Sequence, residues 1–239
     1  MQKSSLLRFI ELYNLSGTVE KVKLVSDGTN LKAKIVTDDK SLAGCIEYKN
    51  LPIEAGEYAV HDTAQLKKML SIFDDTLNIG IDKVNGRNVS FSFKDKTAES
   101  LYMLADLSVI PRTVSVPNTI VFDLELALDD SFMERFIRAK SALLEAETFT
   151  IMMNDKGAVE VIVGHSNINS NRIKLVATPV GVPAPKKDIT FNANYFKDIL
   201  LRNRGTPSVL KINTDGIGHV NFTCADYVAD YYLLKTAIK

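Results

Sequence analysis

Hydrophobic residues follow two alternating patterns along this chain, and the pair of patterns occurs four times. Four short segments have apolar residues three and four positions apart, which predicts amphipathic helices near residues 4–14, 62–73, 131–140 and 194–203. Each of these segments is followed by short runs in which apolar and polar residues alternate, the pattern of strands with one buried face. Each repeat therefore predicts one helix and several antiparallel strands.

The turns between strands confirm the repeat by their spacing. Gly28 and Gly86 are 58 residues apart, Gly157 and Gly216 are 59 apart, and the two halves are offset by 129 and 130 residues. Asn85-Gly86 is a strong hairpin signal because both residues tolerate positive φ. Self-similarity on this scale indicates a duplication within a duplication.

Local signals place the starts of two helices. Asp62 or Thr63 is suited to cap the second helix, and Ser131 with Glu134 has the spacing of a capping box for the third. A single repeat is too small to close a core, so two repeats per domain are needed, with helices on one side of antiparallel sheet. We therefore predict an α+β fold of two similar domains, each a pair of helix-plus-strand units.

The domain boundary is predicted from prolines. Pro111 and Pro117 interrupt any regular element between the halves. We assign residues 1–106 to the first domain, 107–117 to a connector and 118–239 to the second domain.

Composition narrows the setting of the protein. The chain has 239 residues, of which 46% are hydrophobic and 24% charged, with 29 basic and 29 acidic residues. It has no long apolar run and no signal-peptide pattern, so we expect an intracellular, cytoplasmic protein with no membrane association. Cys45 and Cys224 are its two cysteines, which is too few for a disulfide framework or a zinc ribbon.

Charge is distributed unevenly in this neutral chain. Ten cations lie on the helical segments away from the apolar stripes, against five acids counted there. A basic helix layer fits sequence-independent contact with DNA phosphates, although Lys and Arg are also common on any solvated helix. The cations are Lys3, Arg8, Lys67, Lys68, Arg135, Arg138, Lys140, Lys197, Arg202 and Arg204.

The sequence contains no pattern typical of catalysis. His61, His165 and His219 have no His or Cys at metal-ligand spacing, and the paired aspartates lie where Asp caps helices or closes turns. We therefore expect no enzymatic activity, no metal and no cofactor.

The connector and the chain end keep apolar residues where simple linkers would be polar. Val109 and Ile110 precede Pro111, and residues 231–239 read YYLLKTAIK. These residues either pack onto their own domain or form a shallow groove for a partner peptide.

The chain resembles the trimeric, two-domain DNA polymerase sliding clamps of tailed phages, archaea and eukaryotes (proliferating cell nuclear antigen). The resemblance covers the whole chain and is most specific in ESLYMLADLSVIP, NRIKLVAT and DYYLLKTAIK. It implies a ring with helices lining a central hole and sheets outside. The short connector and the lack of an acidic tail are similar to the compact phage clamps.

The resemblance also implies roles for individual residues. Arg135 and Arg138 match a pore-helix pair, and the other helix cations follow by helix correspondence. The partner-peptide pocket is matched by Leu42, Val109, Ile110, Pro111, Leu234, Ala237 and Ile238. Two apolar edge strands are expected to join the subunits head to tail: Leu101, Tyr102, Met103 and Leu104 on one, and Ile173, Lys174, Leu175 and Val176 on the other.

The expected function is that of a processivity factor that encircles duplex DNA as a homotrimer and binds a DNA polymerase and a clamp loader. Two alternatives remain open: a β-rich structural protein of a virion, and a monomeric processivity factor that does not encircle DNA. The sequence does not decide whether the loop near Lys186 and Lys187 contacts DNA.

Overall fold

The computed structural model describes residues 1–112, 120–166, 171–180 and 187–236. These residues form two compact units. The first comprises Met1–Asp38, Gly44–Thr113 and Cys224–Ala229, and the second comprises Asp39–Ala43, Val114–Thr223 and Asp230–Lys239. The units are therefore not contiguous in sequence, because each takes a short segment from the other half of the chain. Among the described residues, no helix is long and apolar enough to cross a membrane.

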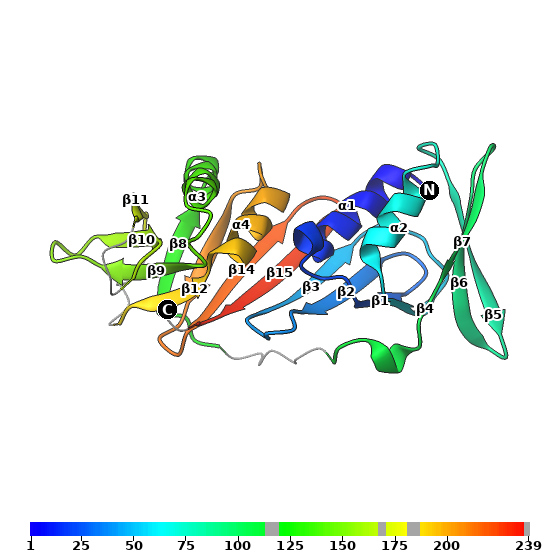
Figure 1. Cartoon of the computed structure of the whole chain (residues 1–239), viewed down its shortest axis with the longest axis horizontal. Helices are drawn as coiled ribbons and strands as arrows, with labels where there is room; N and C mark the ends of the chain where they lie inside the picture. The colour runs from blue at the N-terminus through cyan, green and yellow to red at the C-terminus, as the bar shows by residue number, and fades with distance from the viewer. Residues whose placement is uncertain (113–119, 167–170, 181–186, 237–239) are drawn as a thin grey trace. The chain divides into compact units, whose positions relative to one another are not determined.

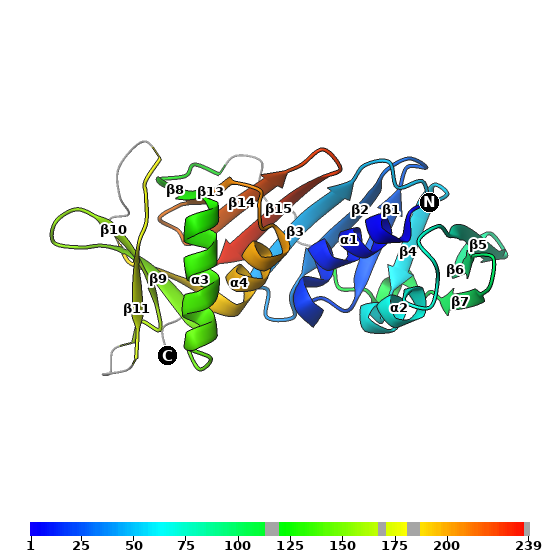
Figure 2. The same cartoon turned by 90° about the horizontal axis from the view of Figure 1, so that it is seen from above.

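The first unit has two helices and two antiparallel sheets (Figure 1). Helix α1 (Lys3–Asn14) contacts α2 (Thr63–Leu70), and Figure 2 shows the two lying side by side over the larger sheet. Within this unit, the strands of the larger sheet follow the order β4-β1-β2-β3, and the smaller sheet has the order β5-β6-β7. The strands are β1 (Val22–Ser26), β2 (Leu31–Val36), β3 (Leu42–Tyr48), β4 (Gly56–Val60), β5 (Asn78–Val84), β6 (Arg87–Lys94) and β7 (Glu99–Met103).

The second unit repeats this arrangement. Helix α3 (Asp130–Ala142) contacts α4 (Ala193–Arg202). Within this unit, the strands of the larger sheet follow the order β15-β14-β13-β8, and a four-stranded sheet has the order β11-β10-β9-β12. The strands are β8 (Leu124–Leu128), β9 (Thr148–Met153), β10 (Val159–Val163), β11 (Ile173–Val176), β12 (Ile189–Asn192), β13 (Ser208–Ile212), β14 (Ile217–Thr223) and β15 (Tyr227–Leu234).

Each unit has a core between its helices and its sheets. In the second unit, Phe136 of α3 contacts Phe149 and Phe196 edge to face, with ring centroids 5.1 and 4.8 Å apart. All three rings are fully buried. In the first unit, Phe9 and Tyr13 of α1 form a similar edge-to-face pair. These contacts bury the apolar stripe of each helix, which is why the 3.6-residue period recurs along the chain.

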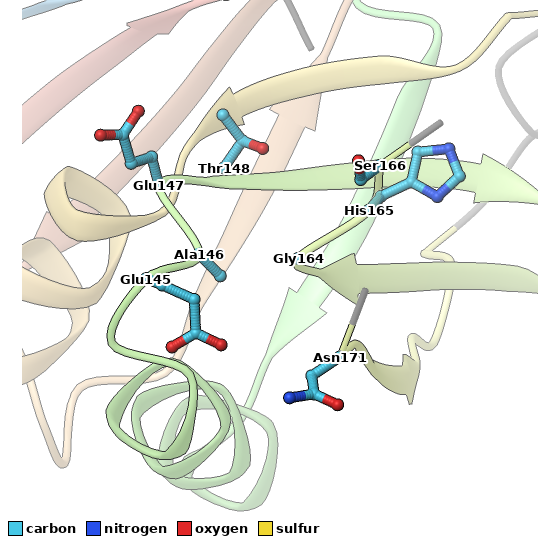
Figure 3. A pocket seen from close by; sticks show the side chains of 8 residues that line it. All are labelled: Glu145, Ala146, Glu147, Thr148, Gly164, His165, Ser166 and Asn171. Carbon is cyan, nitrogen blue, oxygen red and sulfur yellow. The ribbon is translucent and has the colours of Figure 1, made fainter. Parts of the chain in front are cut away.

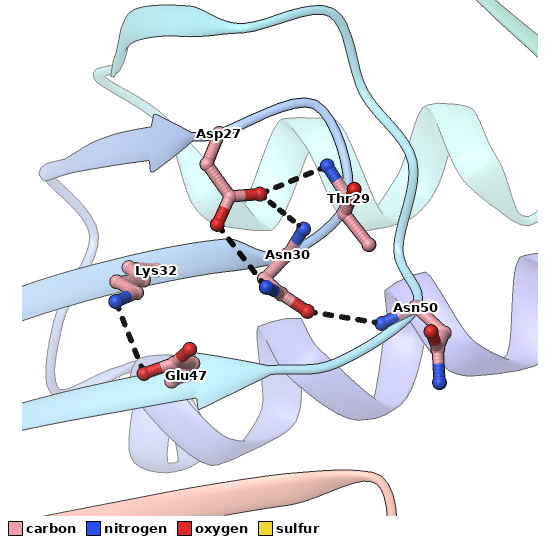
Figure 4. A network of polar contacts seen from close by, with 6 residues as sticks. All are labelled: Asp27, Thr29, Asn30, Lys32, Glu47 and Asn50. Carbon is pink, nitrogen blue, oxygen red and sulfur yellow. Dashed lines mark hydrogen bonds and ion pairs between the residues drawn. The ribbon is translucent and has the colours of Figure 1, made fainter.

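Turn and cap chemistry accounts for the element boundaries. Asn85 and Gly86 have φ values of 50° and 77°, as the predicted hairpin requires. The Asp27 carboxylate accepts hydrogen bonds from the amides of Thr29 and Asn30 and closes the β1–β2 turn (Figure 4). Asp62 caps α2 by accepting from the Gln65 amide at 2.7 Å.

One predicted cap is wrong. Helix α3 starts at Asp130 rather than after Ser131, and its N-cap is Asp129, whose side chain accepts from the Phe132 amide at 2.7 Å. The Ser131 hydroxyl instead accepts from Arg135 one turn later. Both Asp129 and Ser131 have side chains suited to an N-cap. The Asp129 carboxylate is the more favourable of the two, because a negative charge at a helix N-terminus also interacts with the helix dipole.

Candidate functional site

The unpaired helix cations lie mainly on α2 and around α4. Within the described part of the chain, the charged side-chain groups of Lys67, Lys68, Lys197 and Arg204 have no hydrogen-bond or ion-pair partner. Lys68 and Arg204 are exposed, and Lys67 and Lys197 are half-buried. A cation with no internal partner can meet an external anion without first breaking a contact. These four are therefore the helix-layer charges most available to a polyanion.

Arg135 and Arg138, the pair predicted on α3, are exposed, but neighbouring side chains on the same helix bind them and balance their charge. Arg138 donates to the Glu134 carboxylate at 2.6 Å, and Arg135 donates to the Ser131 hydroxyl at 2.8 Å. Asp130, in the first turn of the same helix, adds a second acid beside Glu134. Asp130 and Glu134 balance the two arginines, so the exposed face of α3 is formally neutral. The ion pair is nevertheless weak, about 0.3–0.5 kcal/mol for an exposed i,i+4 pair, and can exchange for a phosphate.

Lys140 does not belong to the exposed set, contrary to the sequence expectation. Its residue is 2% exposed, and its ammonium donates to the carbonyl oxygens of Leu143 and Leu144 at 3.2 and 3.1 Å. Burial, with nearby Lys197, lowers the pKa of the Lys140 ammonium. Lys140 therefore satisfies the end of α3, where the last carbonyls lack helical partners.

The remaining predicted cations are half-buried, and two of them are held by their own unit. Lys3 donates to the carbonyl oxygen of Phe73. Arg8 donates to the Tyr227 hydroxyl at 3.2 Å, and its guanidinium carbon lies 5.4 Å from the centre of that ring. Both cations thus stabilise the fold, while Arg202 is half-buried on the last turn of α4.

Strand β7 forms one edge of the three-stranded sheet of the first unit. Leu101 and Met103 are 56% and 59% exposed, an unusual degree for large apolar side chains. Tyr102 between them is 1% exposed, and its hydroxyl donates to the Asp62 carbonyl and accepts from the Asp62 amide, both at 3.1 Å. Burial raises the pKa of the Tyr102 phenol. The Tyr102 side chain therefore packs into the core of the first unit, and Leu104 is half-buried.

Strand β11 forms an edge of the four-stranded sheet of the second unit. Val176 is 75% exposed, whereas Ile173 and Leu175 are half-buried on the opposite face. Lys174 forms an ion pair with Glu160 on β10 at 3.2 Å. Both predicted interface strands are thus sheet edges with exposed apolar side chains, the kind of edge that proteins normally protect.

Only three of the residues predicted to bind a peptide lie together in one pocket. Val109, Ile110 and Pro111 line one pocket of the first unit. Leu42 is fully buried and Leu234 is 39% exposed, both in segments of the second unit. Ala237 and Ile238 lie outside the described residues, as do Lys186 and residues 113–117 of the predicted connector.

The pocket also contains charges that the sequence reasoning missed. Lys21 and Arg112 line it together with Glu20 and Asp38. Arg112 directly follows the predicted apolar triplet, so a search of the flanking positions could have found it. Lys21 comes from the distant α1–β1 connection and carries no local signal. The pocket therefore combines an apolar side with ionic groups of both signs.

One pocket of the second unit gathers several polar side chains, but they do not form a catalytic constellation. This pocket is lined by Glu145, Glu147, His165 and Asn171, among others, and Figure 3 shows the His165 ring pointing away from the Glu145 carboxylate. Within the described ranges, no group of three His, Cys, Asp or Glu residues could hold a metal ion. These side chains therefore do not form a nucleophile–base pair or a metal centre.

Comparisons with known proteins give a result only at the level of structure. No protein-family model matches the sequence. No curated protein matches it either. Among solved structures, the proliferating cellular nuclear antigen of Entamoeba histolytica matches with a TM-score of 0.72 at 12% identity, covering 99% of this chain and 96% of that one.

Two archaeal structures agree with this match. The A. fulgidus PCNA bound to the C-terminal region of FEN-1 has a TM-score of 0.72 at 12% identity, covering 100% of this chain and 98% of that one. The PCNA2–PCNA3 complex of Sulfolobus tokodaii gives 0.69 at 12% identity, covering 98% and 97%. The chain therefore has the fold of the PCNA sliding clamps over its full length, which confirms the predicted fold class.

Proposed function

We propose that this protein is a sliding clamp: a homotrimeric ring that encircles duplex DNA and tethers a DNA polymerase to it. The full-length match to PCNA structures carries the proposal, since both units and all four helices take part in it. The chain then acts as a non-enzymatic scaffold in DNA replication. We place its work on DNA in the cytoplasm, of the host cell if the protein is viral.

The number of copies follows from the number of units. If the ring closes with six similar units, two per chain require three chains joined head to tail. One edge strand in each unit, β7 and β11, supports this arrangement because each exposes apolar side chains that a neighbouring copy would cover.

Contact with DNA is proposed through the helix layer. Lys67, Lys68, Lys197 and Arg204 supply unpaired charges, while Arg135 and Arg138 add charges that exchange between Glu134, Ser131 and phosphate. Such a surface neutralises phosphates without reading bases. A neutral overall charge and a compensated α3 favour weak contact, which allows a ring to slide.

Partner proteins are proposed to dock at the connector pocket. The A. fulgidus PCNA is bound to the C-terminal region of FEN-1, and we infer that this chain also takes a peptide segment of its partners, polymerase and clamp loader included. Val109, 54% exposed at this pocket, is the best point to test. Val109→Asp should abolish polymerase stimulation while the ring mass stays unchanged; normal stimulation would move the docking site elsewhere.

Encirclement is tested by comparing retention of the protein on circular and on linear DNA. The protein is loaded onto nicked circular DNA by its cognate loader, and retention is measured by gel filtration before and after the circle is linearised. A ring is retained on the circle and lost from the linear DNA, because it slides off the ends. Equal retention on both would reject encirclement and favour a monomeric processivity factor. No association with either would favour a structural protein.

A further inference from the structure

We propose that the open edge of β5 in the first unit binds an extended segment of a partner protein, which adds a strand to the sheet as β8 does in the second unit. The two units contain the same order of elements, so the second unit is an internal template for the first. This edge is formed by other residues than the connector pocket, and its occupancy does not depend on ring formation.

The correspondence between the units can be followed element by element. In the second unit, β8 leads into α3 and pairs antiparallel with β13, the strand that follows α4. In the first unit, residues 1–2 lead into α1 and pair with the residues just before β5, the strand that follows α2. Residues 1–2 therefore correspond to the end of β8, and β5 corresponds to β13.

The first unit contains only the end of this fourth strand. The Met1 ammonium donates to the Leu77 carbonyl at 2.8 Å, the Leu77 amide donates to the Met1 carbonyl at 3.1 Å, and Gln2 forms a bridge with Thr76. By contrast, β8 pairs along five residues of β13. Among the described residues, β5 has β6 as its only strand neighbour, and Figure 1 shows its other side without a strand.

The open edge presents backbone groups in a defined pattern. The Leu77 N–H and C=O both point toward Met1, and backbone direction alternates along an antiparallel strand. Ile79 and Ile81 therefore direct their N–H and C=O groups to the open side. A bulge after Asp82 interrupts the strand, so the stretch that can pair regularly is residues 78–82.

Burial shows that the apolar side chains of this edge are incompletely covered. The N-caps of α1 and α3 align the edges, and on this alignment Ile79 and Ile81 correspond to Leu210 and Ile212 of β13. Leu210 and Ile212 are each 1% exposed beside β8, whereas Ile79 and Ile81 are half-buried. Ile79 also lines a narrow pocket whose wall consists of apolar residues, Phe93 among them. An added strand would complete this cover.

The β8 strand indicates the chemistry of the occupant. Its Leu124 and Leu126 are 1% and 0% exposed, while Glu125 between them is half-buried. A segment that pairs in the same way would place two apolar side chains opposite Ile79 and Ile81, with a polar residue between them. Backbone hydrogen bonds then supply affinity, and the alternate apolar side chains supply specificity.

A second protein is favoured over a second copy of this chain. The strand of this chain with the matching pattern is β8, and both of its edges are already paired. One edge pairs with β13, and the other forms a bridge between Leu126 and Pro179. A second copy could not supply β8 without opening its own sheet.

A labelled β8 peptide tests the edge directly. The probe is a fluorescein-labelled peptide with the sequence of residues 122–128, FDLELAL, blocked at both ends. Its fluorescence anisotropy should rise to saturation as the concentration of the whole chain increases. A matched peptide with Leu124→Ser and Leu126→Ser should bind at least about tenfold more weakly, because two buried leucine side chains are lost.

Methylation of the peptide amides separates strand pairing from general hydrophobic contact. In β8, the Ala127 amide donates to Thr178 and the Glu125 carbonyl accepts from Val180, so these residues point away from β13. In the peptide, N-methylation at positions 125 and 127 should therefore leave binding largely unchanged. N-methylation at positions 124 and 126 should abolish it.

A strand supplied by the chain itself locates the site. The sequence LELA, that of residues 124–127, is added before Met1 so that it continues the pairing of Met1 with Leu77 along β5. This extension should raise the melting temperature by about 5–10 °C, because it buries two leucine side chains. It should also block binding of the labelled peptide. The extension SESA is the matched control and should do neither.

Three outcomes would overturn the inference. Absence of saturable peptide binding, or an unchanged melting temperature of the LELA-extended chain, would show that β5 does not accept a strand. Peptide binding that persists in the LELA-extended chain would place the site elsewhere, for example at β13. Self-association of the native chain that LELA abolishes and SESA does not would identify a second copy as the occupant. Retention on circular DNA tests the ring separately, so each of these results leaves the proposed clamp function intact.

Discussion

Replacement of Val176 by Asp should break the junctions of the ring. Val176 is 75% exposed at the β11 edge, so a neighbouring copy would remove most of its surface from water. Full burial of a Val side chain contributes about 1.5–3 kcal/mol, of which about 1–2 kcal/mol applies to the exposed fraction. A carboxylate buried and left unpaired at the junction costs about 1–3 kcal/mol more.

The combined effect is large enough to measure. A destabilisation of about 3 kcal/mol per junction corresponds to about two orders of magnitude in the dissociation constant. Mass photometry over a dilution series should therefore show trimer for the native protein at concentrations where Val176→Asp is monomeric. The thermal melt of the variant should remain close to that of the native monomer, because the substituted side chain contacts mainly solvent.

The chain supplies a matched control for this experiment. Val84 is 55% exposed on β5, at the opposite edge of the sheet that contains β7. Val84→Asp makes the same chemical change away from the proposed junction and should leave the trimer intact. The reasoning is refuted if Val176→Asp has the native mass distribution, or if Val84→Asp dissociates the assembly to the same extent.

Three further predictions separate structural from functional residues. Lys140→Met should lower the free energy of unfolding by about 1–3 kcal/mol, because a buried carbonyl at the end of α3 is left without a donor; urea denaturation measures this, and an unchanged midpoint would contradict the capping role. Tyr102→Phe should cost about 1–2 kcal/mol by leaving the Asp62 backbone unsatisfied, with no change in assembly mass; dissociation of the trimer at unchanged stability would show that the Tyr102 hydroxyl acts at the subunit interface instead. Lys67→Gln with Lys68→Gln should reduce the salt dependence of DNA binding by about 0.9 in the log–log slope for each phosphate that the variant no longer neutralises, and an unchanged slope would remove these residues from the DNA-facing set.

Some properties of the candidate site could be predicted from the sequence, and others could not. The edge strands β7 and β11 could be expected from the resemblance of their sequences to the edge strands of sliding clamps. The availability of each cation could not, because it depends on partners from elsewhere in the chain. Arg8, for example, is held by Tyr227, which lies 219 residues away in sequence.

The alternation of 3.6- and 2-residue periods was sufficient to predict the four helices, the antiparallel strands and the fourfold repeat, since each depends on neighbours a few positions away. The Asn85-Gly86 turn was predictable for the same reason. Tertiary packing alone decided that Lys140 is buried and that Tyr102 faces the core. The Tyr102 hydroxyl bonds to the backbone of Asp62, which lies 40 residues away, so no local pattern encodes that contact. The hydrogen bonds of Lys140 to Leu143 and Leu144 are local, but its burial depends on the elements packed around the end of α3.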